Sequence, residues 1–427
     1  MMKEKIKMFL GLYVMSLGVV GASLMPLSAF SAERDCEAEI HVDCGSAPNA
    51  VFVDSGVSEQ SQLWVVFAQN NHVFFTASSD FGNQYSAPIA VNSMAEKIYT
   101  NGENRPKVAV GEQGEIYISW TQKTEGRYAG DIRFSRSLDQ GKTFSEPVTI
   151  NNDGLVTSHR FDSLHVAESG KVYIAWLDKR DQVAAREAGG AYNGAALYFA
   201  VSDDSGGSFL NPETLENYRV ANNSCECCRI AIESHGEDDV AVVWRHIFGE
   251  NTRDHAYAVL RANGRSTRGR ATVDSWQIDA CPHHGPDITL DSSAVEKDQY
   301  HMVWFSNGDD HKGIYYGLHN FTAGGESHVY SVDDSPGASH PQIAVVKTQG
   351  LAKSEMKAVV IAWKSFDGEK TDIKFIESSD NGASWIDKGI AMSTAGNSDH
   401  PLLLTDDSDM YLAWHTDEEG YRVAPIK

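Results

Sequence analysis

Sulfur and imidazole side chains gather in two short segments of this chain, 225–228 (Cys-Glu-Cys-Cys) and 281–284 (Cys-Pro-His-His). Thiolates and imidazoles are the donors that copper(I) and zinc prefer in proteins. Three cysteines so close together are poorly placed for structural disulfides, because neighbouring cysteines can be bridged only with strain. The two segments therefore point to a transition-metal site, for copper or zinc, or to redox-active thiols.

A structural interpretation of the same cysteines stays open. The chain has six cysteines, an even number, and an oxidising compartment would make disulfides the default. One bridge from Cys225 or Cys227 to Cys281 would then tie the two segments together and leave a thiol over. In that case the protein would be a disulfide-stabilised interaction scaffold.

The N-terminus is typical of an exported protein. Lys3, Lys5 and Lys7 precede an apolar run from Met8 to Leu24, and small residues follow near Ala29. This order predicts a cleaved signal peptide over residues 1–32 and a bacterial periplasmic or secreted location. No later segment is apolar for long enough to span a bilayer. A net charge of −23 makes nucleic acid and anionic lipid improbable partners.

A repeated phrase organises the rest of the chain. Seven short apolar runs end in an aromatic residue, and they lie roughly 50 to 70 residues apart, a period typical of propeller blades. The aromatic residues are Phe67, Trp120, Trp176, Trp244, Trp304, Trp363 and Trp414. Alternating runs before and after each one predict further antiparallel strands. The sequence therefore predicts an all-β fold, a seven-bladed β-propeller, with six blades as the alternative.

The ends of the chain suggest how such a ring would close. The last repeat stops after its third strand, Tyr421 to Pro425, and the residues from Glu37 to Val42 precede the first inner strand. Pairing these two segments would supply the missing fourth strand and remove both exposed edges. We therefore expect one propeller domain over residues 33–427, with an N-terminal strand in the last blade.

Four of the repeats share a turn of the form Ser-x-Asp-x-Gly-x-x-aromatic. Its aspartates are Asp80, Asp139, Asp204 and Asp380. Asp accepts hydrogen bonds from turn amides, and Gly provides the positive φ of a tight hairpin. With these turns the chain resembles the Asp-box (BNR-repeat) propellers of the sialidase superfamily over nearly all of its predicted mature length. The resemblance implies that the turns are structural and lie on the face opposite the active site.

The repeat also places the residues that could do chemistry. In a propeller, the linkers from each outer strand to the next inner strand gather at one mouth of the central channel. The candidate metal ligands that fall in these linkers are Cys225, Cys227, Cys228, Cys281, His283, His284, His340 and His400. Since His340-Pro341 and His400-Pro401 repeat one phrase, repeat geometry alone could also explain these two histidines. A small ligand, a metal ion or a glycan is the expected partner.

A glycan-active enzyme is the main alternative function. Four arginines map to the same mouth, Arg105, Arg160, Arg229 and Arg245. The resemblance to sialidases implies that three of them could bind a substrate carboxylate. However, no Tyr/Glu nucleophile pair can be assigned, and Arg105-Pro106 is only a fragment of the family's Arg-Ile-Pro phrase. Whether the protein is an enzyme stays open; if it is one, a sialidase-type glycoside hydrolase is expected, or else a glycan-binding propeller.

Overall fold

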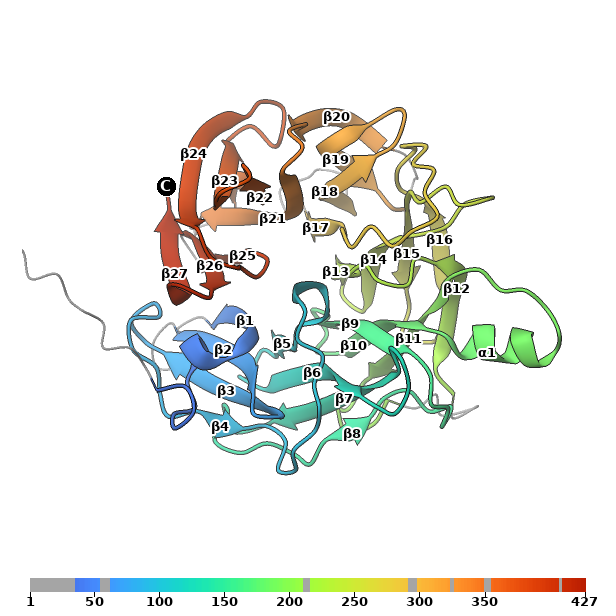
Figure 1. Cartoon of the computed structure of the whole chain (residues 1–427), viewed down its shortest axis with the longest axis horizontal. Coiled ribbons are helices and arrows are strands. Elements are labelled where there is room, and N and C mark those ends of the chain that lie inside the picture. Colours follow the sequence, from blue (N-terminus) through green and yellow to red (C-terminus); the bar gives the residue numbers. More distant parts are fainter. Residues whose placement is uncertain are drawn as a thin grey trace, which may run out of the picture.

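Seven small antiparallel sheets form a ring around a central channel in the computed structural model (Figure 1). It describes residues 35–53, 62–209, 216–290, 298–322, 326–348, 355–406 and 409–427. The expected signal peptide, residues 1–32, lies outside them. The predicted seven-bladed propeller is confirmed, and the six-bladed alternative is excluded.

Each blade begins with an inner strand beside the channel. The inner strands are β1 (Ser46–Val53), β5 (Lys107–Val110), β9 (His159–Val166), β13 (Ala231–His235), β17 (Asp287–Leu290), β21 (Ala338–Thr348) and β25 (Leu402–Thr405). The second strands, which carry the repeated aromatic residues, are β2 (Gln62–Gln69), β6 (Ile116–Lys123), β10 (Val172–Asp178), β14 (Asp239–Arg245), β18 (Gln299–Asn307), β22 (Glu355–Phe366) and β26 (Met410–Thr416). Every inner and second strand predicted from the sequence overlaps one of these.

The outer half of each blade is less regular. The third strands are β3 (His72–Ser78), β7 (Gly130–Ser137), β11 (Ala195–Ser202), β15 (His255–Leu260), β19 (Lys312–Asn320), β23 (Thr371–Ser378) and β27 (Gly420–Ile426). Six blades continue to a fourth strand, namely β4 (Ile89–Ala90), β8 (Val148–Thr149), β12 (Tyr218–Ser224), β16 (Ser266–Arg270), β20 (Glu326–Asp333) and β24 (Ile386–Thr394). Helix α1 (Arg180–Glu187) and two 3-10 turns, η1 (Val42–Cys44) and η2 (Gly102–Asn104), lie in the connections.

The hydrophobic core lies between neighbouring blades. Trp64 and Phe75 of the first blade pack with Ile118 and Trp120 of the second, and other pairs of adjacent blades repeat this arrangement. The six repeated tryptophans are 0–4% exposed, which confirms that they are core residues. Truncating one of them to alanine would cost about 3–5 kcal/mol of stability.

The ring closes differently from the prediction. In the described residues, Glu37 to Val42 form a turn, a loop and the start of η1, and the last sheet holds three strands, β25, β26 and β27. Asp43 of η1 instead accepts a hydrogen bond from the Tyr421 backbone N–H, at 3.1 Å. Val42 also enters the core shared by the first and last blades. The expected N-terminal strand was wrong because side-chain packing and capping, rather than a ladder, cover this edge.

The four Ser-x-Asp-x-Gly turns share one hydrogen-bond pattern. In each, the serine hydroxyl donates to the aspartate at 2.6–2.8 Å and accepts the glycine N–H. The glycines have φ between 75° and 90°, which L-residues rarely adopt. Each turn precedes the outer strand of its blade, and a linker to the next blade follows that strand. Turns and linkers therefore lie on opposite faces of the ring, called here the turn face and the linker face.

Among the described residues, no helix is long and apolar enough to cross a membrane.

Candidate functional site

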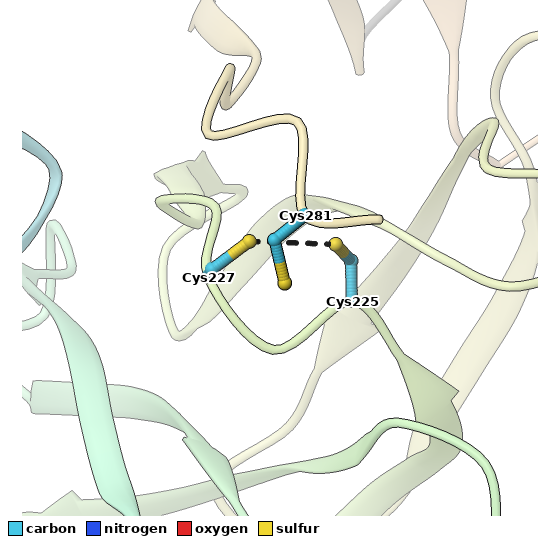
Figure 2. Close-up of side chains that lie close together, drawn as sticks. All are labelled: Cys225, Cys227 and Cys281. Carbon is cyan, nitrogen blue, oxygen red and sulfur yellow. Dashed lines mark hydrogen bonds between the residues drawn. The ribbon is translucent and has the colours of Figure 1, made fainter. Parts of the chain in front are cut away.

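Three cysteines from two linkers converge on the linker face (Figure 2). Cys225 directly follows β12, Cys227 lies in the same linker, and Cys281 lies in the linker between β16 and β17. Their sulfur atoms all lie within 4.8 Å of one another, and those of Cys225 and Cys227 are 3.8 Å apart. We call these three residues the thiol cluster. The structure thus brings together cysteines that the sequence separates by more than fifty positions.

Burial divides the four free cysteines of the described chain. Cys225, Cys227 and Cys228 are 1–4% exposed and join the core between the third and fourth blades, whereas Cys281 is exposed. The Cys228 sulfur lies 3.9 Å from that of Cys225, but it is not in the group that shares a common point with Cys281. Solvent can therefore reach the thiol cluster at Cys281, whereas Cys228 is buried in the core next to the cluster.

A buried aspartate fixes the loop that carries Cys281. Asp254 is fully buried and its carboxylate accepts the backbone N–H groups of Asp274, Ser275 and Trp276 at 3.1–3.2 Å. Arg270 forms an ion pair with the same carboxylate. Together these contacts anchor the start of the linker that ends in Cys281. On the other side, the Cys225 N–H donates to the Arg245 carbonyl at 2.9 Å.

The thiol cluster favours one negative charge, on Cys225. Hydrogen bonds from Cys227, Cys228 and Cys281 lower the pKa of Cys225 well below its ordinary value, although burial opposes this. The Arg253 guanidinium donates to the Cys225 sulfur at 3.3 Å and adds to the effect. The same interaction with Cys225 raises the pKa of Cys227 and of Cys281. A thiolate flanked by thiols is a ready nucleophile or metal ligand.

The predicted histidines form a separate group nearer the channel. His340 lies at the start of β21 and His400 just before β25, and their rings stack with centroids 3.6 Å apart. The His284 ring lies 4.6 Å from that of His340. His283 is exposed, and its backbone carbonyl accepts from His340 Nε2 at 3.0 Å. The structure therefore divides the predicted metal ligands into two sets, the thiol cluster and the histidines.

Sequence reasoning missed two residues at these sites, Glu103 and Arg253. Glu103 of η2 joins His340 and His400, with ligand atoms within 4.8 Å of one another. It lies two residues before Arg105 in the linker that had been singled out, so its place in the repeat was the available signal. Arg253 ends an irregular loop between β14 and β15, outside the linkers from which the candidate ligands were drawn.

Each of the four predicted arginines is engaged by contacts of its own. Arg105 bonds to Asp399 and to the carbonyls of Pro48 and His400, and Arg245 bonds to three backbone carbonyls. Arg229 donates to the Pro286 carbonyl, while Arg160 lies over aromatic rings, including that of Tyr99. Each guanidinium thus either donates hydrogen bonds to backbone carbonyls or packs against an aromatic ring.

The remaining two cysteines are joined to each other. Cys36 and Cys44 form a disulfide that closes an eight-residue separation beside η1. Neither of them is therefore a candidate metal ligand. The bridge that the sequence left open, from Cys225 or Cys227 to Cys281, is not formed.

A third linker-face group is saturated by its own contacts. Buried His159 bonds to the Gly130 carbonyl and to Asp153, with Asp178 3.7 Å away. Although burial opposes protonation, hydrogen bonds to Asp131 and Asp153 raise the pKa of His159 to about 10. This group is accordingly a buried ion-pair network that joins linkers and strands.

Of the comparisons with known proteins, the one with solved structures found matches, and these concern the fold. No protein-family profile and no curated protein matches the chain. An ulvan lyase of polysaccharide lyase family 25, bound to -[GlcA(1-4)Rha3S]-, superposes with a TM-score of 0.51 and 11% identity, covering 90% of this chain and 94% of its own. The chain folds as a seven-bladed β-propeller.

Sialidases also occur among the solved structures that superpose on this propeller. A Hadza microbial sialidase superposes with a TM-score of 0.47 and 14% identity, over 85% of this chain and 76% of its own. The Trypanosoma rangeli sialidase, in complex with the inhibitor DANA, superposes with a TM-score of 0.46 and 11% identity, over 89% of this chain and 54% of the sialidase chain. At such identities the likeness concerns the fold alone.

Proposed function

We propose that this propeller is an exported protein that binds one transition-metal ion, copper in preference to zinc, through its thiol cluster. The observation that carries the proposal is the convergence of the Cys225, Cys227 and Cys281 sulfur atoms. Two sulfur ligands of one tetrahedral metal, each about 2.3 Å from it, would lie about 3.8 Å apart. The Cys225 and Cys227 sulfurs are separated by 3.8 Å.

The donor set supports copper(I) in particular. All three ligand atoms are thiol sulfurs, which are soft donors that select Cu(I), whereas imidazole and carboxylate donors suit harder divalent ions. The arrangement also suits a site that loads from solvent, because Cys281 is exposed while Cys225 and Cys227 are buried. When bound, the ion would displace the remaining thiol protons, and Arg253 would offset the excess negative charge.

Export is part of the same proposal. It is supported by the expected signal peptide and by the Cys36–Cys44 disulfide, which is of a kind that persists in oxidising compartments. In the periplasm or outside the cell, this protein would bind or carry copper as its cargo.

Copper(I) binding by the reduced protein under anaerobic conditions tests the proposal. In competition with a chromophoric Cu(I) chelator, the wild-type protein should take up one tightly held equivalent. Cys227→Ser combined with Cys281→Ser should lower the affinity at least a hundredfold, because it removes two of three sulfur donors. Cys228→Ala is the comparison variant, since it removes a buried thiol outside the converging group, and it should lower the affinity by less than tenfold. Unchanged copper binding in the double variant would overturn the proposal.

Thiol redox exchange is a second candidate function, favoured by the contact between Arg253 and Cys225. Exposed Cys281 could attack a disulfide of a partner protein, with the Cys225 thiolate, held beside Arg253, close by. Cys225 would then resolve the mixed disulfide, so that a Cys225–Cys281 bond forms and the partner leaves as two thiols. Loss of insulin-disulfide reduction in Cys225→Ser, with copper binding absent from the wild type, would favour this function over the first.

A further inference from the structure

The channel side of the linker face contains a second group of ligand atoms that shares no residue with the thiol cluster. Glu103, His340 and His400 place one ligand atom each within 4.8 Å of the others. Glu103 and His400 come from the linkers that precede the second and seventh blades, and His340 comes from the start of β21 in the sixth blade. We propose that these residues form a second metal site, for a divalent ion such as Zn²⁺ or Cu²⁺. This inference stands apart from the proposed copper(I) function, because it rests on different residues and different donor chemistry.

Unpartnered buried atoms are the first observation behind it. In the described part of the chain, Glu103 Oε1, His340 Nδ1 and His400 Nδ1 are buried and lack a hydrogen-bond partner. Glu103 is only 3% exposed. A buried polar group without a partner is destabilising, so three of them in one place call for a ligand. A metal ion would satisfy all three at once.

The tautomer of His340 supports coordination. His340 Nε2 donates its proton to the His283 carbonyl at 3.0 Å, which leaves Nδ1 with a free lone pair. Histidine ligands of metals commonly donate their other ring N–H to a backbone carbonyl in this way, which fixes the ring and raises its basicity. The neighbouring His284 ring, 4.6 Å from that of His340, also has a buried Nδ1 without a partner among the described residues.

The approach of Glu103 to the histidines is built into η2. Asn104 is fully buried, and its side-chain oxygen accepts from the Thr121 hydroxyl at 3.0 Å and the Phe161 N–H at 2.8 Å. At Gly102 any Cβ would overlap the His400 ring, so only glycine lets the turn come this close. The Arg229 N–H donates to Glu103 Oε2 at 2.6 Å, which orients the carboxylate, while Oε1 has no hydrogen-bond partner among the described residues.

The donor set separates this site from the thiol cluster. Two imidazoles and one carboxylate are the ligands of divalent catalytic zinc sites and related centres with open positions. The positive charge of Arg105 next to this site is compensated, because its Nη2 pairs with Asp399 at 3.1 Å. A divalent ion here would retain open positions toward the channel, where a water or a small anionic ligand could bind.

The test uses full-length protein in which the thiol cluster is disabled by Cys227→Ser and Cys281→Ser. Titration with Co²⁺ should give one equivalent of a complex with visible d–d bands and no thiolate charge-transfer band. Zn²⁺ should displace it. Adding Glu103→Gln or His400→Gln should weaken Co²⁺ binding at least tenfold, while His283→Gln, on an exposed neighbouring histidine, should leave it unchanged.

Two results would overturn the inference. One is a thiol-disabled protein that binds no Co²⁺, and the other is equal Co²⁺ affinity with and without Glu103→Gln. Glu103→Gln can keep the hydrogen bond from Arg229, and thermal melting of the metal-free variants checks that the fold is retained. Because copper(I) binding by the wild type is measured separately, failure of this second site and failure of the thiol cluster are distinguishable.

Discussion

The two faces of the ring differ in how their polar groups are satisfied. On the turn face, four hairpins repeat one hydrogen-bond pattern, and each aspartate accepts from its own serine and from turn amides. On the linker face the segments are all different, and in the described chain Glu103, His340 and His400 keep buried polar atoms without partners. Repetition of one closed hydrogen-bond pattern marks a structural role, whereas irregular segments whose unsatisfied ligand atoms lie together mark the place where a ligand is expected.

The largest loss of stability is expected from a substitution of Asp254, a structural residue of the linker face. Asp254→Ala should lower the free energy of unfolding by about 3–5 kcal/mol, because three backbone N–H groups and Arg270 lose a buried partner. It should also weaken copper binding, since Asp254 anchors the loop that leads to Cys281. Denaturant unfolding measures the first effect. Asp279→Ala, on an exposed carboxylate of the same loop, should change stability by no more than about 0.5 kcal/mol.

Alkaline pH should lower the free energy of unfolding through His159 on the linker face. Protonated His159 stabilises the fold fully below its unfolded pKa near 6.5, and this stabilisation is lost as pH rises through its folded pKa of about 10. Between these values stability should fall by up to about 1.4 kcal/mol per pH unit. His159→Gln should remove this slope from unfolding curves measured between pH 7 and 10. If the wild type and the variant have parallel profiles, His159 is not protonated in the folded protein.

The smallest effect is expected on the turn face. Asp139 accepts from the Ser137 hydroxyl at 2.7 Å and the Thr143 N–H at 2.9 Å, within an exposed hairpin. Asp139→Ala should therefore cost about 1 kcal/mol of stability and leave copper binding unchanged. Thermal unfolding and the chelator competition measure the two quantities. A loss of copper affinity in this variant would contradict the division between the faces.

The sequence predicted the repeated parts of the molecule and not the irregular ones. The tryptophans follow the period of the blades, so their strands and burial could be found by counting. The ring closure could not, since Asp43 and Val42 act through side-chain contacts that leave no periodic pattern. The repeat predicted that the linker cysteines and histidines lie at one mouth of the ring. Their division into two groups depends on loop conformations, which the repeat does not determine. Glu103 approaches His400 only because Gly102 lacks a side chain, which no count of repeats reveals.

The seam between the last and first blades has a mechanical consequence. Other adjacent blades are consecutive in the chain, so a linker ties each pair, but these two are held by contacts alone. The Asp43 cap on Tyr421, the bond from His415 to the Asp43 carbonyl and the shared core around Val42 act together as a latch. The Cys36–Cys44 loop stiffens the part of the latch that reaches across. If the ring is pulled apart, we expect this seam to open first. It lies on the other side of the ring from the thiol cluster, which is formed by the linkers between blades three, four and five.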